Sequence, residues 1–341
     1  MTTSPGRYLL EIATTVALLG GLYSLMFHYQ LGAPVAAEYW VYEAKVAKLH
    51  VASRIKDRKL VVLGGSSALF SIDSRRLEEA TGRPTVNLAI HAGLWLPYVF
   101  DYAKPVLASG DIVILMLEYP YYGSPNPAAS WFAGNVMAWD APYVRNLGWI
   151  ERLRVLVSVP AKRVANGVAA KFYEARLRQI HHRLVRDPSD IGREAEKIWE
   201  GKLYRERSFG YAFQNMNERG DIQNNRGTTY EPHPERRPVY AQDAVETIRA
   251  FADYCAARGI TLLIAWPAAM RVPDLQDPAA QAVLAEVAAG LRRMGLQVLG
   301  SPGDFFAERR YFFDTIYHSN EEGRQSVTGK LVEELRRKGL N

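Results

Sequence analysis

The sequence predicts a three-layer α/β/α domain with a parallel five-stranded sheet, preceded by one transmembrane helix. Short apolar runs alternate with amphipathic stretches, which is the pattern of strands covered by helices on both faces. An apolar run about twenty residues long stands before them, at residues 8–27. The length of 341 residues accommodates one α/β unit of roughly 200 residues together with an insertion and an anchor.

Residues 8–27 have the length and composition of a membrane-spanning helix. The run carries a single charge, Glu11, and at about 1.5 Å per residue it crosses a hydrocarbon core about 30 Å thick. A cleaved signal peptide is the alternative, because Arg7 precedes the run. The apolar region of such a peptide is only about 7–15 residues long, and Val35-Ala36-Ala37 is a poor cleavage site. We therefore expect residues 1–35 to form an uncleaved signal anchor.

Residues 36–58 have the composition of a juxtamembrane helix. Tyr39, Trp40 and Tyr42 lie near its start. Trp and Tyr favour the lipid headgroup region, where a ring can be half buried and half hydrated, so we expect this helix to lift the globular domain off the bilayer. Packing of these aromatic side chains on the domain itself is the alternative.

The globular domain is expected at residues 59–341. Residues 59–63 form an apolar run that is too short for a helix and is followed by Gly64-Gly65-Ser66-Ser67, which is typical of a buried parallel strand ending in a tight turn. The other strands are expected at residues 85–89, 111–117, 260–266 and 296–299. Helices are expected at residues 74–81, 95–107, 241–258, 278–294 and 321–338.

Residues 123–240 form an insertion that is too long for an ordinary connection. Between residues 150 and 186 it holds nine Lys or Arg against two acids, with apolar residues interleaved at helical spacing. Such a segment can lie on an anionic membrane surface or dock on a membrane partner. Solvated helices of a cap domain are the alternative.

Composition excludes several classes of protein. With 48% hydrophobic residues and evenly spread charges, the chain is folded and carries one span rather than many. The single cysteine, Cys255, rules out an intramolecular disulfide and is typical of a small buried hydrophobe. We expect neither cofactor nor metal, because phosphate loops, dinucleotide motifs and metal-ligand clusters are missing and His181-His182 are typical of an exposed helix face. The net charge of +6 comes without a recognition motif, so nucleic acid is not an expected partner.

Residue types suited to acyl transfer follow the predicted strands. In parallel sheets ligands bind at the carboxyl ends of the strands, where residues 64–67, 91–93 and 118–119 are expected. A serine needs an imidazole as base and a carboxylate that fixes its tautomer, and His318 and Asp314 can supply both. The backbone N–H groups of Ser66 and Gly93 are candidates for the oxyanion hole.

At these positions the chain resembles the SGNH (GDSL-type) hydrolases and acyltransferases. Gly64-Gly65-Ser66 resembles their G-D-S block, residues 87–93 resemble their second block with its oxyanion glycine, and the segment from Asp314 to His318 resembles their C-terminal Asp–His block. The three blocks stand in the family's order. The resemblance implies an SGNH/flavodoxin-like fold, with Ser66 as nucleophile because Ile72-Asp73 lies in register with it. Ser67 is the alternative nucleophile, and a helix-capping role is the alternative for both hydroxyls.

The chain departs from the family pattern at three places. Three residues rather than two separate Asp314 from His318, which leaves the role of Asp314 open. Gly65 replaces the aspartate of G-D-S, and Glu118-Tyr119 stand where a Gly-x-Asn block is usual. A glutamate cannot donate a hydrogen bond while ionised, so either Tyr119 substitutes or a partner completes the oxyanion hole. The sequence from Gly64 to Ala68 also nearly matches the elbow of α/β-hydrolases, but that elbow normally follows several strands.

The resemblance implies a membrane-anchored O-acyltransferase or esterase that acts on acyl, above all acetyl, groups of an extracytoplasmic polysaccharide. Such proteins work beside a multi-span acyltransferase of the MBOAT type. The implied location is the inner (cytoplasmic) membrane, with a single span and the globular domain on the periplasmic side. A catalytically impaired accessory subunit of a membrane acyltransferase or polysaccharide assembly complex is one alternative, and a lipase that acts on bilayer lipids is another.

Overall fold

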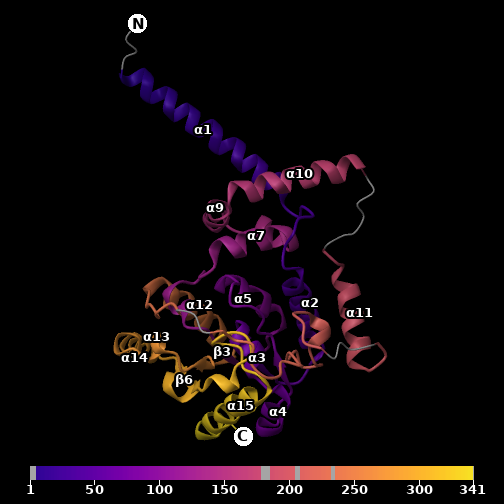
Figure 1. Ribbon diagram of the computed structural model, residues 1–341, viewed down its shortest axis with the longest axis vertical. Helices are drawn as coiled ribbons and strands as arrows, with labels where there is room; N and C mark the ends of the chain where they lie inside the picture. The colour runs from indigo at the N-terminus through magenta and orange to yellow at the C-terminus, as the bar shows by residue number, and fades with distance from the viewer. Residues whose placement is uncertain (1–4, 178–184, 204–207, 232–234, 341) are drawn as a thin grey trace. The chain divides into compact units, whose positions relative to one another are not determined.

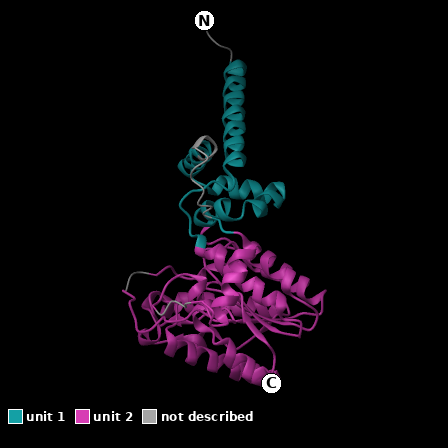
Figure 2. Cartoon of the chain, turned by 90° about the vertical axis from the view of Figure 1, so that its right-hand side faces the viewer, with its two compact units in different colours: residues 1–39, 129–186 teal, residues 40–128, 187–341 magenta. Residues whose placement is uncertain are grey.

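A computed structural model describes residues 5–177, 185–203, 208–231 and 235–340 (Figure 1). The chain divides into two compact units (Figure 2). Unit 1 comprises Met1–Tyr39 and Ala129–Arg186, and unit 2 comprises Trp40–Ala128 and Asp187–Asn341. Residues 178–184, which include the His181-His182 pair and part of the basic segment of the insertion, lie outside the described residues.

Unit 2 contains the predicted five-stranded parallel sheet. Its strands are β1 (Leu60–Gly64), β2 (Thr85–Asn87), β3 (Ile112–Met116), β4 (Thr261–Ala265) and β6 (Gln297–Val298). They lie in the order β2-β1-β3-β4-β6, all parallel, with Val62 paired to Asn87 on one side and to Ile114 on the other. The residues of β1 and β3 are all buried, which explains their unbroken apolar sequences. The fold class predicted from the sequence is confirmed.

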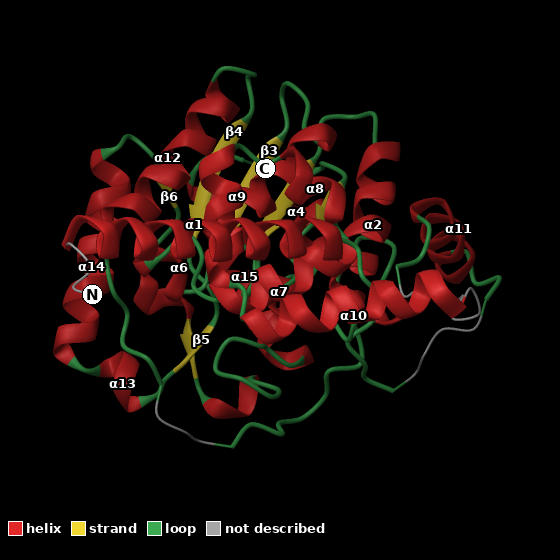
Figure 3. Cartoon of the chain, turned by 90° about the horizontal axis from the view of Figure 1, so that it is seen from above, coloured by secondary structure: helices red, strands yellow, loops and turns green. Residues whose placement is uncertain are grey.

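Helices cover both faces of this sheet (Figures 1 and 3). On one face α5 packs on β1 and on α12, with the rings of Phe100 and Phe251 stacked at 4.1 Å between centroids. On the other face α15 packs on α3 and α4. The helices of unit 2 are α2 (Tyr39–Arg54), α3 (Ser66–Ser71), α4 (Ser74–Thr81), α5 (Leu96–Ala103), α6 (Pro120–Gly123), α11 (Pro188–Trp199), α12 (Gln242–Ala256), α13 (Pro273–Gln276), α14 (Pro278–Arg293) and α15 (Glu321–Arg337).

Short elements complete unit 2. β5 (Ala269–Met270) and β7 (Phe306–Ala307) form a separate two-stranded sheet. The 3-10 helices are η1 (Lys104–Val106), η2 (Phe213–Asn215), η3 (Pro302–Phe305) and η4 (Arg309–Tyr311). The small sheet lies next to the loop that carries His318, since Met270 N–H donates to the Ile316 carbonyl at 2.8 Å.

Unit 1 consists of helices. They are α1 (Pro5–Gln30), α7 (Ala129–Trp139), α8 (Ala141–Asn146), α9 (Trp149–Ser158) and α10 (Ala161–Leu177). Helix α1 is long and apolar enough to cross a membrane. Its last turn and the residues after it belong to the core of the unit, since Phe27, Leu31 and Ala33 are buried and Gly32 N–H donates to the Met137 carbonyl at 2.7 Å. The residues following the candidate span therefore hold the helices of the insertion together.

Candidate active site

The predicted nucleophile turn lies at the carboxyl end of β1. The strand ends at Gly64, where a Cβ would come within 2.0 Å of the Met116 carbonyl oxygen, so only glycine allows β1 and β3 to approach this closely. Helix α3 begins at Ser66, after the extended Gly65. As the first residue of a helix, Ser66 has an N–H group with no intrahelical acceptor.

The two serines of the turn have different surroundings. The Ser67 side chain is fully buried, and its hydroxyl donates to the Ala268 carbonyl at 3.3 Å. Ser66 is 7% exposed, and its hydroxyl donates to Glu118 Oε1 at 3.3 Å. Because the Ser67 hydroxyl is held by the backbone, this geometry favours Ser66 as the nucleophile.

Asp314 and His318 form a hydrogen-bonded pair. Nδ1 of His318 lies 2.7 Å from Oδ1 of Asp314, so the Nδ1–H tautomer is favoured and Nε2 remains available as a proton acceptor. The three intervening residues are accommodated by a closed loop, in which Phe313 N–H donates to the His318 carbonyl at 2.8 Å and His318 N–H donates to Thr315 Oγ1 at 3.1 Å. The four-residue offset therefore turns the carboxylate back toward the ring.

Tyr211 is a third member of this arrangement. Its hydroxyl donates to Asp314 Oδ2 at 2.5 Å and lies 3.3 Å from His318 Nδ1. Burial alone raises the pKa of Asp314, but the hydrogen bond and charge of His318 and the hydrogen bond from Tyr211 bring it below its usual value. Asp314 is therefore an ionised acceptor that can stabilise an imidazolium.

The Asp–His loop is seated on the helix that begins with Ser66. The His318 ring stacks on Phe70 with centroids 4.1 Å apart and an interplanar angle of 6°. Ser71 and Ser319 are joined by a hydrogen bond of 2.8 Å between their hydroxyls. Phe70 lies four residues after Ser66, one helical turn along α3, so the ring of the candidate base packs on the helix that begins with the candidate nucleophile. In this structure Ser66 donates to Glu118 rather than to His318.

Glu118, just after β3, lies directly against the nucleophile turn. Its Oε1 accepts the Ser67 N–H at 2.6 Å as well as the Ser66 hydroxyl. A Cβ at Gly65 would come within 2.2 Å of Oε2 and 2.6 Å of Oε1. The carboxyl group thus fills the space that a side chain at position 65 would need. Glycine at 65 and glutamate at 118, both unusual for the pattern, therefore depend on each other sterically.

The other residues proposed for the oxyanion hole are arranged differently. Gly93 N–H donates to Nδ1 of His91 at 2.9 Å, so an oxyanion reaches this donor only if the His91 ring moves. The ring of Tyr119 packs beside those of Tyr317 and Phe306, with centroids about 6 Å away, and its buried hydroxyl has no hydrogen-bond partner among the described residues. Of the two N–H groups predicted for the oxyanion hole, that of Ser66 belongs to the candidate nucleophile, and that of Gly93 already has His91 as acceptor.

A side chain of α2 forms a hydrogen bond with the loop that carries Gly93. Lys48, fully buried in α2, donates a short hydrogen bond to the Ala89 carbonyl. The Asn87 side chain donates to the Ala68 carbonyl at 3.1 Å and to Asp221 at 3.2 Å. Burial lowers the pKa of Lys48 to about 7, with a smaller opposing effect from Asp221. A buried lysine is therefore a structural support of the second block.

Aromatic rings line the approach to His318. Tyr211 contacts Trp40 at 5.3 Å between centroids and Phe209 at 5.1 Å, and Trp40 contacts His91 at 5.9 Å. Trp40 thus packs against other side chains of unit 2, which favours the packing alternative for this residue over a place among lipid headgroups. Tyr211, Phe209 and Lys48 were not identified from the sequence, since none of them stands in a recognisable motif.

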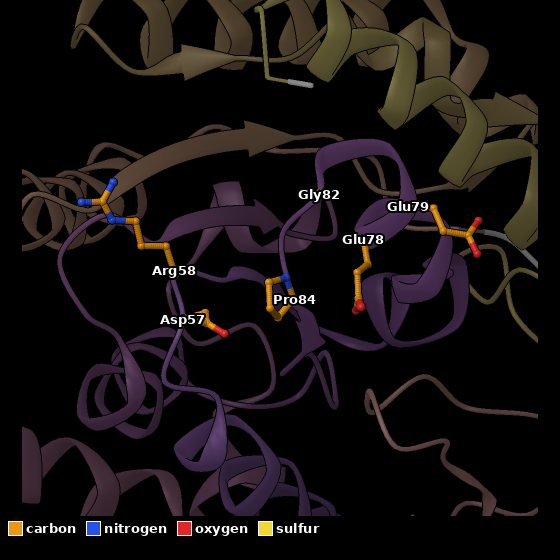
Figure 4. A pocket seen from close by; sticks show the side chains of 6 residues that line it. All are labelled: Asp57, Arg58, Glu78, Glu79, Gly82 and Pro84. Carbon is orange, nitrogen blue, oxygen red and sulfur yellow. The ribbon is translucent and has the colours of Figure 1, made fainter.

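A hollow on the surface lies elsewhere. It has a volume of ≈ 760 Å³ and is lined by Asp57, Arg58, Glu78, Glu79, Gly82 and Pro84 (Figure 4). These residues precede β1 and β2, so the hollow lies at the amino ends of parallel strands, away from the edge that carries Ser66. Among the described residues, no cluster of three or more His, Cys, Asp or Glu could hold a metal ion.

Comparison with known proteins gives distant structural likenesses. No model of a protein family matches the chain, and no curated protein sequence matches it. Among solved structures the chain is similar to protein YxiM from Bacillus subtilis, with a TM-score of 0.36 and 10% sequence identity. The match covers 84% of this chain and 58% of that one, so this chain spans less than two thirds of YxiM.

Proposed function

We propose that this protein is a membrane-anchored serine acyltransferase or esterase of the SGNH type, acting on acetyl or related acyl groups of a cell-surface or exported polysaccharide. The observation that carries the proposal is the Asp314–His318 pair stacked on Phe70, one helical turn from Ser66. Serine acyl transfer requires a base that is oriented by a carboxylate and lies within reach of the nucleophile.

In the proposed reaction, Nε2 of His318 takes the Ser66 hydroxyl proton as Oγ attacks the acyl carbon. The carbonyl π electrons move to its oxygen, and Ser66 N–H donates to this oxyanion. Collapse of the intermediate breaks the bond to the leaving oxygen, which receives the proton from His318. Water or a glycan hydroxyl then attacks the acyl-serine, giving its proton to His318, and the proton returns to Ser66 as the acyl group leaves.

The test is ester turnover by the full-length chain in detergent micelles, with a chromogenic acetyl ester as substrate. Ser66→Ala is expected to lose turnover to the level without protein, while the matched control Ser67→Ala keeps most of it. Equal loss in the two variants, or loss only in Ser67→Ala, would contradict the assignment of the nucleophile.

A catalytically impaired accessory subunit is the second candidate, and one observation favours it. Gly93 N–H already has His91 Nδ1 as acceptor, so the oxyanion hole is incomplete at this donor. If the wild-type chain turns over no ester and Ser66 reacts with no activated acyl or phosphonate reagent, the accessory role replaces the enzymatic one. Removal of the ring in His91→Ala is expected to raise turnover if the His91 contact is what limits the enzyme.

We further propose that α1 is a retained single-pass anchor in the inner membrane, with unit 2 on the periplasmic side. Cleavage near residue 35 would remove Phe27, Leu31 and Ala33 from the core of unit 1. It would also remove the hydrogen bond from Tyr23 to the Val159 carbonyl at 3.0 Å. Intact mass of the protein isolated from membranes tests retention, and protease accessibility of unit 2 in spheroplasts tests its side. A mature mass that lacks residues 1–35 would contradict the anchor.

The outer face of α9 supports a membrane surface as a partner. Trp149, Leu153 and Val157 recur at four-residue intervals on one face and are 76%, 50% and 69% exposed. The Tyr23 hydroxyl, near the end of the candidate span, donates to the carbonyl of Val159 at the end of α9. Arg154 is exposed beside the apolar face. In nanodiscs with brominated lipid, quenching of tryptophan fluorescence should decrease strongly in Trp149→Phe and little in Trp131→Phe. Equal decreases would favour a solvated face.

We also propose that the substrate is a glycan and that a multi-span membrane protein supplies the acyl groups. The rings of Trp40 and Tyr211 near His318 give a sugar an apolar surface on which to stack. An acyltransferase on the far side of a membrane also needs acyl groups delivered across it, which a multi-span partner of the MBOAT type would do. Co-purification from native membranes tests the partner, and loss of acetyl groups from the exported polymer in a Ser66→Ala strain tests the substrate.

A further inference from the structure

The Glu118 carboxyl is bonded on one oxygen only. Oε1 accepts both the Ser67 N–H, at 2.6 Å, and the Ser66 hydroxyl, at 3.3 Å. Oε2 is buried and has no hydrogen-bond partner among the described residues. An ionised carboxylate offers lone pairs on both oxygens, and burying one oxygen without a donor is costly. An unpaired buried oxygen costs more on a charged carboxylate than on a neutral carboxyl group, so this geometry suits the neutral form.

Apart from His318, the described groups that face Glu118 supply no cation that would compensate a negative charge on it. Its titratable neighbours are His318 and three tyrosines, Tyr121, Tyr122 and Tyr317. In the part of the chain that the structure describes, no lysine or arginine forms an ion pair with it. Burial raises the pKa of Glu118. The N–H groups of Ser67 and Glu118, the charge of His318 and the Ser66 hydroxyl oppose this only in part.

We propose that Glu118 is a positioning residue that works as a neutral carboxylic acid and that its ionisation switches Ser66 off. This inference rests on the proposed function of the same site. A neutral carboxyl holds the turn through Ser67 N–H and accepts only a long hydrogen bond from Ser66, so the hydroxyl can turn to His318. A carboxylate would hold the Ser66 hydroxyl through a stronger, charge-assisted bond. Its negative charge would also oppose the oxyanion that forms beside the turn.

The competing role for Glu118 is that of a general base, because a carboxylate can also take the Ser66 proton. The two roles differ in what Glu118→Gln does. Glutamine keeps an acceptor oxygen for Ser67 N–H and is neutral at every pH, so it reproduces the proposed state and cannot act as a base. Glu118→Leu is the matched control, because it removes the acceptor and keeps a similar volume.

The first experiment measures acetyl-ester turnover of the full-length chain across pH. Wild type is expected to lose activity about tenfold per pH unit once Glu118 ionises. Glu118→Gln should stay within about threefold of wild type at lower pH and lack this alkaline loss, and Glu118→Leu should lose at least about tenfold at every pH. An inactive Glu118→Gln that still folds, or an alkaline loss equal to that of wild type, would overturn the proposal.

A second measurement does not depend on turnover. The infrared difference spectrum between wild type and Glu118→Gln should contain the carbonyl band of one protonated carboxyl, which disappears as the pH rises. Absence of this band at every pH at which the chain is folded would overturn the inference. If the band is present but Ser66→Ala leaves ester turnover unchanged, the proposed function fails and the neutral state of Glu118 stands.

Discussion

The most demanding prediction for the proposed triad is Asp314→Asn. Asp314 Oδ1 lies 2.7 Å from His318 Nδ1, and the two side chains are only 25% and 10% exposed. When His318 becomes an imidazolium in the transition state, the attraction between two unit charges about 4 Å apart at an effective dielectric constant near 20 is worth about 4 kcal/mol. Asparagine keeps the shape and loses this term, so kcat should fall about a thousandfold.

The assay is acetyl-ester turnover at saturating and at limiting ester. Because the lost attraction develops only as the proton moves to His318, kcat and kcat/KM should fall together, with KM little changed. Glu321→Gln, an exposed acid near the same loop that is paired with Arg226, is the matched control and should be silent. If Asp314→Asn keeps the wild-type kcat while His318→Ala is inactive, Asp314 does not stabilise the imidazolium. A Ser–His dyad or another carboxylate would then take its place.

Three further predictions concern supports of the site. Because burial lowers the pKa of Lys48 to about 7 from 10.5, the unfolded chain binds a proton that the folded chain lacks between these values. The unfolding free energy of wild type relative to Lys48→Met should therefore rise across that window by up to about 1.4 kcal/mol per pH unit, and a flat difference in urea titrations would contradict this. Gly65→Ala places a Cβ within 2.2 Å of Glu118 Oε2 and should cost about 1–3 kcal/mol by the same titration. Adding Glu118→Ala should restore most of that loss, and a merely additive double variant would contradict the shared packing. Tyr211→Phe removes the bond to Asp314 and should lower kcat about three- to tenfold in the ester assay, whereas unchanged kcat would show that this bond plays no part.

Elements with a strong local pattern were predictable from the sequence. The apolar runs that form β1, β3 and β4, and the glycine turn before Ser66, are determined by local spacing and by the steric demands of a strand end. The parallel order of the sheet followed from the alternation of strands and helices. The Asp314–His318 pair was identified because both residues stand in one short segment.

The remaining features depend on contacts between distant parts of the chain. Tyr211 reaches Asp314 across 103 positions, and Glu118 fills the space beside Gly65 from another strand. Neither contact leaves a periodic signal, because each depends on how the loops pack. The four-residue offset left the role of Asp314 open in the sequence, and the loop around Thr315 brings Asp314 Oδ1 to 2.7 Å from His318 Nδ1. The association of residues 129–186 with the N-terminal helix is likewise a tertiary property.

The most direct test of the account is the position of a covalent adduct. The full-length chain is treated with a fluorophosphonate, and the modified peptide is sequenced by mass spectrometry. We expect an adduct on Ser66 in wild type and in Ser67→Ala, none in Ser66→Ala, and much slower formation in His318→Ala. An adduct on Ser67, or labelling at Ser66 that proceeds at the same rate without His318, would contradict it.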